Sequence, residues 1–182
     1  MTLLNQNDAP WQADQMLYIA PDSFELIQER FLAPLGKSIT RIERERESAE
    51  YGADRFDLDG QTCLYRHAKD TPKKIGQFVT LWKRPMSFSE IAPFDIDDGI
   101  DHVIIFADGC GRFGVFVFQA KLLAKKDIFS EHSKGGRRAF RVYAPWTEPA
   151  AVQARQSKTW QCSYFVELTH FQQGMAQLSQ II

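Results

Sequence analysis

The order of apolar and polar residues first predicts a helix and then an ambiguous charged segment. Residues 22–35 carry large apolar side chains at every third or fourth position, which predicts an amphipathic helix that ends near Gly36. Asp22 and Glu25 have the spacing of a capping box at its start. Residues 40–51 are dense in charges of both signs and fit either an exposed helix or an extended edge segment.

The middle of the chain has the patterns of β-strands. Residues 55–67 alternate around an Asp59-Gly60 turn and predict a hairpin. Residues 78–82 and 102–106 are apolar on both sides of the pleat, which is typical of central strands covered on both faces. Residues 113–118 resume as a strand after a turn with two glycines, so we expect a second hairpin there.

The later segments add helices and one more strand. A short helix is expected near residues 122–126, a strand at 139–144 and a helix at 150–158. The order of elements predicts an α/β protein in which a mixed central sheet is flanked by helices. We expect one domain over residues 21–182, preceded by an N-terminal extension, residues 1–20.

Composition places the chain among water-soluble globular proteins. Its 182 residues are 44% hydrophobic and 25% charged, and the formal net charge of -1 excludes a uniformly basic nucleic-acid binder. No segment approaches the roughly 18 apolar residues that cross a bilayer, and the N-terminus lacks the pattern of a secretory signal. The three cysteines are far apart, without a CxxC pair. Together these features predict a cytoplasmic protein with reduced thiols and no membrane contact.

The charge is unevenly distributed, because two basic runs flank a segment, residues 85–101, that contains no Lys or Arg. If the runs converge in the fold, their side chains would neutralise phosphates of a nucleic acid while Trp82, Tyr143 or Trp146 stacks on bases. The candidate phosphate contacts are Lys69, Lys73, Lys74, Lys83 and Arg84 in the first basic run, and Arg137, Arg138 and Arg141 in the second basic run.

A second group of polar residues is expected at one end of the sheet. Asp101 precedes one central strand, and Gln119-x-Lys121 follows the strand that should pair with it, with residues 119 and 121 on one side of the pleat. This arrangement resembles a PD-(D/E)xK nuclease site, in which acids hold a divalent cation and the Lys stabilises developing charge. Gln119 stands in the place of the second acid. The candidate catalytic residues are Asp101, Gln119 and Lys121, with Asp101 as the ligand of Mg²⁺ or Mn²⁺ and Asp97, Asp98, Glu47 or Glu50 as helpers.

Five stretches of the chain carry similarity to a known family: residues 47–56, 66–84, 111–121, 136–146 and 159–165. Together they resemble the MepB family of small bacterial proteins. The resemblance implies one compact domain with a restriction-endonuclease-like α/β core. The family pattern has Phe-Pro-Lys where this chain has Phe118-Gln119-Ala120-Lys121, so Lys121 carries over, whereas Gln119 belongs to this chain's own version. The family pattern also has a proline where Ala144 stands.

These features favour a nucleic-acid-binding protein with a basic, aromatic groove on a nuclease-like core and with weak or no cleavage. Its ligand would be DNA or RNA, single strands included, and no cofactor is required. Two alternatives stay open. One is a metal-dependent nuclease that uses the Asp101 group, and the other is a protein-interaction module whose aromatic patch around Trp146 and Trp160 docks a partner.

Overall fold

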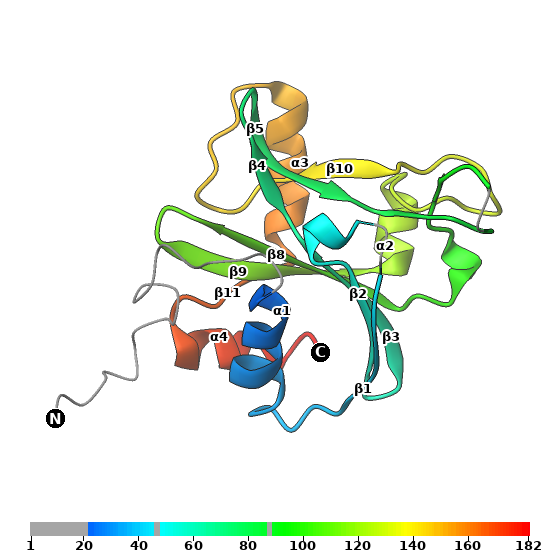
Figure 1. Cartoon of the computed structure of the whole chain (residues 1–182). Helices are drawn as coiled ribbons and strands as arrows, with labels where there is room; N and C mark the ends of the chain where they lie inside the picture. Colours follow the sequence, from blue (N-terminus) through cyan, green and yellow to red (C-terminus); the bar gives the residue numbers. More distant parts are fainter. Residues whose placement is uncertain (1–21, 46–47, 87–88) are drawn as a thin grey trace, which may run out of the picture.

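A six-stranded mixed sheet lies at the centre of the fold (Figure 1). The computed structural model describes residues 22–45, 48–86 and 89–182, so the expected extension, residues 1–20, lies outside the described residues. Neighbouring strands of this sheet are antiparallel except β3 and β8, which run parallel. The strand order is β1 (Ile39–Arg44), β2 (Asp54–Leu58), β3 (Gln61–His67), β8 (His102–Gly109), β9 (Arg112–Gln119) and β11 (Phe165–Glu167).

The central strands are covered on both faces, as their uninterrupted apolar sequences predict. Along β8, Val103 and Ile105 face one hydrophobic cluster, whereas Ile104 and Phe106 face the other. All four side chains are buried. The alternation of a strand therefore sends neighbouring residues into two separate cores, one on each side of the sheet.

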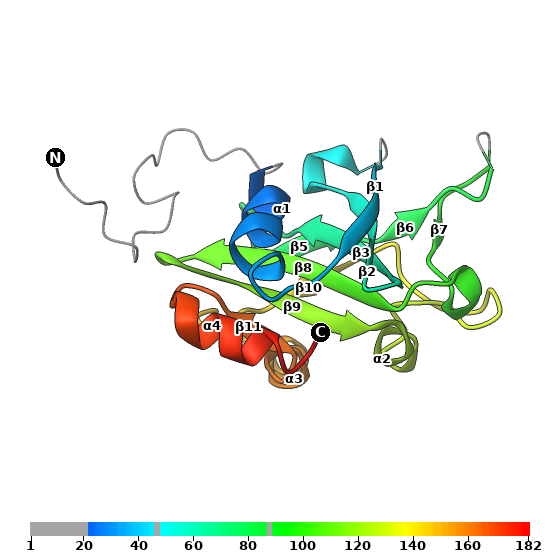
Figure 2. The same cartoon turned by 90° about the horizontal axis from the view of Figure 1, so that it is seen from below.

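The two faces of the sheet are covered by different elements (Figure 2). One face packs against α1 (Asp22–Ile27), which continues as the π-helical turn η1 (Gln28–Leu32), and against α4 (Phe171–Leu178). The other face packs against α2 (Ala120–Lys125), α3 (Val152–Cys162) and a second sheet. The strand order of that three-stranded sheet is β10 (Ala139–Val142), β5 (Lys74–Thr80) and β4 (Lys69–Thr71). The remaining short elements are β6 (Trp82–Lys83), β7 (Ala92–Pro93), η2 (Ala49–Tyr51) and η3 (Ile96–Asp98).

The α/β class and the mixed central sheet are confirmed, but one predicted central strand belongs elsewhere. Residues 78–82 were expected in the central sheet, whereas β5 pairs with β10 and β4 in the second sheet. The reason is that Val79 and Leu81 are buried against the central sheet, while Phe78 and Thr80 point the other way and are only partly covered. An apolar sequence alone therefore does not show whether a strand belongs to the central sheet or to a second sheet that packs on it.

Local boundaries also differ from the sequence-based expectations. The charged segment at 40–51 is an edge strand followed by the 3-10 turn η2, which decides between the two alternatives. The predicted hairpins at 55–67 and 102–118 are present. The strand β11 and the helix α4 were not predicted. Within the described residues, the helices are too short or too polar to span a membrane.

Candidate functional site

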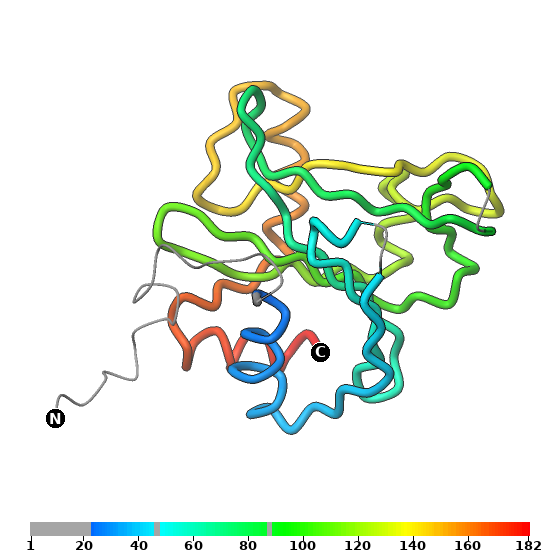
Figure 3. Tube along the Cα trace, in the orientation of Figure 1, coloured from blue at the N-terminus to red at the C-terminus, as the bar shows by residue number. Residues whose placement is uncertain are grey.

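The two basic runs meet in the second sheet, because β5 and β10 pair with each other. Arg141 lies opposite Phe78, and Ala139 lies opposite Thr80. The two strands run side by side in Figure 3, although they are far apart in the sequence. The backbone N–H of Leu81 also donates to the carbonyl of Arg138 at 2.8 Å, which extends the pairing toward Trp82. The fold therefore brings the two basic runs together.

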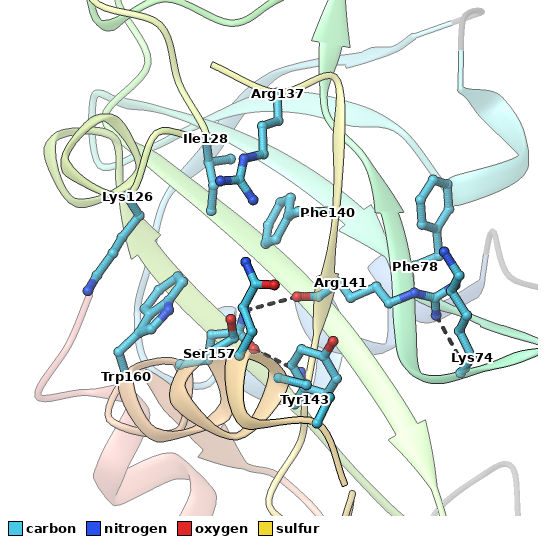
Figure 4. A pocket seen from close by; sticks show the side chains of 14 residues that line it. Lys74, Phe78, Lys126, Ile128, Arg137, Phe140, Arg141, Tyr143, Ser157 and Trp160 are labelled. Carbon is cyan, nitrogen blue, oxygen red and sulfur yellow. Dashed lines mark hydrogen bonds between the residues drawn. The ribbon is translucent and has the colours of Figure 1, made fainter. Parts of the chain in front are cut away.

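An open cavity of about 580 Å³ lies beside β10, where α3 passes it (Figure 4). This volume is in the range of small-molecule and nucleotide sites. The described residues that line it include four cations and no Asp or Glu. The cations are Lys74, Lys126, Arg137 and Arg141, and the aromatic side chains are Phe78, Phe140, Tyr143 and Trp160. We call this site the β10–α3 cavity.

The wall formed by β10 is fixed to α3 by one buried amide. The side chain of Gln161 donates from Nε2 to the carbonyl of Arg141 at 2.9 Å and accepts from the backbone N–H of Tyr143 at 2.8 Å. It therefore satisfies two backbone groups that face away from β5, as a neighbouring strand would. Gly76, at φ +85°, leaves room on the other side for the ring of Tyr143.

Arg141 is held in a defined position beside the cavity. Its guanidinium donates to the carbonyl of Gly76 at 2.5 Å and to the hydroxyl of Thr71 at 2.6 Å, and it lies 5.6 Å from the centre of the Phe78 ring. These contacts reduce the conformational freedom that an arginine loses when it binds a phosphate. They involve neutral groups, so the positive charge of Arg141 is not cancelled.

The other cations of the cavity are more exposed. Arg137 has one distant acidic neighbour, because its guanidinium is 3.7 Å from the carboxylate of Asp127 with both side chains more than half exposed. Such an exposed pair is weak and does not keep a phosphate away. Lys126 is exposed, and its ammonium lies 5.1 Å from the centre of the Trp160 ring. Lys126 and Trp160 were not among the residues predicted to bind nucleic acid.

The other predicted cations are close in sequence to residues of the cavity but do not line it. The side chains of three of them contact other groups. The ammonium of Lys69 lies 4.9 Å from the ring centre of Tyr51. Lys83 forms an ion pair with Asp98. Arg84 donates to the carbonyl of Ser89. Lys73 lies in the turn between β4 and β5, and the side chain of Arg138 is exposed.

The two tryptophans proposed as stacking residues are partly covered. Trp82 has the guanidinium of Arg84 5.9 Å from its ring centre. Trp146 has Arg112 at 5.1 Å on its ring and Phe165 at 5.5 Å. Neither tryptophan lines the β10–α3 cavity. The structure instead places Trp160 there.

The candidate nuclease residues come together only in part. The strands β8 and β9 pair antiparallel with His102 opposite Gln119, and the N–H of Ala120 donates to the carbonyl of Asp101 at 2.9 Å. The expectation that Gln119 and Lys121 share one side of a pleat is wrong, because the strand ends at Gln119 and Lys121 lies in the first turn of α2.

The surroundings of Asp101 do not fit a divalent cation. One oxygen of its carboxylate accepts from the backbone N–H of Thr62 at 2.8 Å. Asp98 is paired with Lys83, and Asp97 lies 3.0 Å from the ring of His132. In the parts of the chain that are described, no three His, Cys, Asp or Glu side chains gather as metal ligands. The other proposed helpers add nothing here: Glu50 is exposed in η2, and Glu47 lies outside the described residues.

The three cysteines are free thiols that differ in burial: Cys63 is buried, Cys162 is partly buried and Cys110 is exposed. Burial raises the pKa of the Cys63 thiol to about 12. Burial also raises the pKa of Cys162 above its ordinary value. Because the thiolate is the reactive form, burial disfavours nucleophilic chemistry at these two thiols.

Comparison with known proteins gives two related findings. Residues 45–167 match the family model described as MepB-like. The fold is similar to a solved structure described as the crystal structure of MepB, with 31% sequence identity and a TM-score of 0.67 over 71% of this chain and 87% of that one. A search among curated proteins gives no significant match.

Proposed function

The chain belongs to the MepB-like family, and we propose that it binds nucleic acid at the β10–α3 cavity without cutting it. The observation that carries this proposal is the composition of the cavity: four cations and four aromatic side chains with no acidic residue among its described lining. Cations neutralise phosphates and release condensed counterions, and aromatic rings accept bases, so the lining has both parts of a nucleic-acid site.

The position of both basic runs supports nucleic acid over protein docking. Docking would be favoured if the two runs lay on opposite faces, whereas β5 and β10 are paired strands of one sheet. The first basic run continues in this sheet through Lys69 in β4 and Lys73 in the following turn, whereas Arg84 follows β6. These residues would extend the phosphate contacts beyond the cavity. Lys83 would contribute less, because Asp98 already neutralises it.

The proposed absence of cleavage rests on the hydrogen bonding of Asp101 and on the residue that stands in place of the second acid. Its carboxylate is engaged by the backbone of Thr62, and the second acid of a nuclease site is replaced by Gln119, which has no charge. A restriction-endonuclease-like origin of the core stays part of the proposal. It is supported by the mixed sheet and by the position of Asp101 beside the end of the β8–β9 hairpin. A cytoplasmic location also stays part of the proposal, in keeping with the free thiols.

The experiment is a salt titration of binding by fluorescence anisotropy, with labelled 20-nucleotide single strands and 20-base-pair duplexes of DNA and RNA. For the double variant Lys126→Ala and Arg137→Ala, we expect weaker binding to every sequence and a log–log salt slope that is smaller by about 0.7 to 0.9 for each lost phosphate contact. The matched control is Lys125→Ala, which removes an exposed charge next to Lys126 but outside the cavity lining.

An unchanged salt slope in the double variant, or an equal effect of the control, would contradict the proposed site. The same samples are incubated with Mn²⁺ or with EDTA and analysed for fragment length. Mn²⁺-dependent fragments that disappear in Lys121→Ala would show a nuclease and overturn the absence of cleavage.

A further inference from the structure

We propose that the β10–α3 cavity seats one unstacked base of a single-stranded nucleic acid, with the indole of Trp160 as the stacking surface. This inference rests on the proposed function and specifies its ligand as a single strand.

Each tryptophan of the described residues has a cation near its ring, but the three cations are held differently. Arg112, which covers Trp146, is fixed by two hydrogen bonds to the carboxylate of Glu167 at 2.9 and 2.5 Å. Arg84, next to Trp82, donates to a backbone carbonyl. Lys126, next to Trp160, has no ion pair with the described part of the chain.

One part of the Trp160 ring is therefore packed against the core, and another part is covered only by a side chain that can move away. Its ring packs on the buried Phe118 with 5.3 Å between the ring centres. Next to it, the ammonium of Lys126 lies on a flexible, exposed side chain. A base that enters the cavity would displace this ammonium, since stacking is stronger than an exposed cation–π contact. The displaced Lys126 would then be available to contact the phosphate of the same nucleotide.

The surroundings of Trp160 match the parts of a nucleotide. Phe140 and Ile128 are buried and provide apolar surface for a base. Gln153 and Ser157 are four residues apart on α3, so they share one side of the helix, and both line the cavity. Their amide and hydroxyl groups can donate to or accept from the edge of any base. Figure 4 shows Arg137 and Lys126 at the same cavity as Trp160, where they would contact phosphates.

The cavity favours a single strand because of where its aromatic surface lies. In a duplex the bases are stacked on one another inside the helix, and only the phosphates and groove edges reach a protein surface. A concave site with the ring of Trp160 inside it cannot stack on a paired base. A single strand can turn one base out at little cost and place its phosphates on the flanking cations.

The test measures anisotropy with fluorescein-labelled dT10 and U10 and with a 20-base-pair DNA duplex at low salt. We expect Trp160→Leu to weaken binding of both decamers at least about fivefold, the low end of the contribution of one stacked base. Binding of the duplex should change less than about twofold, since only phosphates are contacted there. Trp160→Phe, which keeps an aromatic ring, should restore most of the decamer affinity.

A second variant guards against misfolding of Trp160→Leu, because that ring also packs on Phe118. Ser157→Phe fills the cavity from α3 and keeps every cation, and we expect the same selective loss of decamer binding. In the unchanged protein, dT10 should quench tryptophan fluorescence, and Trp160→Phe should remove most of that quenching.

The outcomes separate the two proposals. If neither decamers nor duplex bind in a salt-dependent manner, the proposed function itself fails. If all bind but Trp160→Leu and Ser157→Phe leave decamer affinity unchanged, nucleic-acid binding stands and the base-seating inference is overturned. Equal losses for decamers and duplex would overturn it as well, because the cavity would then act through phosphates alone.

Discussion

Replacement of Gln161 by Leu tests whether one buried amide holds the candidate site together. The side chain of Gln161 is 1% exposed, and its two hydrogen bonds satisfy the carbonyl of Arg141 and the N–H of Tyr143. Leucine has a similar size but no polar atom, so it would leave both backbone groups buried and unpaired. Each such group costs about 1–3 kcal/mol. Burial of an apolar side chain in place of an amide offsets about 1 kcal/mol of this. We expect the free energy of unfolding to fall by about 1–5 kcal/mol.

The assay is urea unfolding followed by tryptophan fluorescence, with the midpoint and the m-value fitted separately. Gln156→Leu is the matched control, because Gln156 is exposed on the same helix and lies outside the cavity lining; its stability should stay within about 0.5 kcal/mol of the unchanged protein. A loss below about 1 kcal/mol in Gln161→Leu at an unchanged m-value would refute the reasoning. It would mean that water or a shifted backbone satisfies the edge of β10.

Three further substitutions test other parts of the structure. Gly114→Ala should lower the thermal midpoint, because a Cβ there would collide with the carbonyl of Val166 in β11, an overpacking that costs about 1–3 kcal/mol or more; an unchanged melting curve would mean that β11 lies farther away. Asp101→Ala should cost about 1 kcal/mol through the lost bond to Thr62, whereas Asp101→Asn, which keeps an oxygen acceptor, should cost less; equal losses in urea unfolding would argue against this bond. Three hydrogen bonds hold the pKa of Asp95 well below its usual value, so its stabilisation is complete above about pH 4 and is lost as the pH falls toward the folded-state pKa. Melting curves from pH 7 to pH 3 should fall less steeply in Asp95→Asn, and parallel curves would contradict the assignment.

The fold could be predicted where one face or both faces of a strand are buried along its whole length. The hairpin of β8 and β9 satisfies this condition, and its position and turn follow from the sequence. The edge strand β1 does not, because its side chains are exposed except for that of Ile39. It is held by ion pairs of Arg41 with Asp57 and of Arg44 with Asp54, which join β1 to β2. The structure of β1 therefore depends on contacts with another strand, and the local sequence pattern does not reveal these contacts.

The candidate site could be predicted in part for a similar reason. The two basic runs are visible as charge clusters, but their meeting depends on the pairing of β5 with β10. The sequence does not place Lys126 and Trp160 at one site, because the cavity forms only where the end of α2 and the helix α3 come together in the fold. Lys121 was correctly predicted to follow the strand β9, but it was wrongly placed on the pleat beside Gln119. The residues around Gln119 do not predict the change from strand to helix at this point.

A chain with a formal net charge of -1 can still present an acid-free cavity, because many of its carboxylates are engaged elsewhere. Glu45 pairs with the fully buried Arg66, and Glu167 pairs with Arg112. Neither of these acids lines the β10–α3 cavity. The positive potential is therefore local, and at physiological salt it extends only about one Debye length, roughly 8 Å, from the surface. Such a site should not accelerate long-range encounter with nucleic acid as a uniformly basic protein does. If the site binds nucleic acid as proposed, its affinity comes from contacts made inside the cavity, where the stacking residue Trp160 and the buried amide of Gln161 that shapes the wall are as important as the cations.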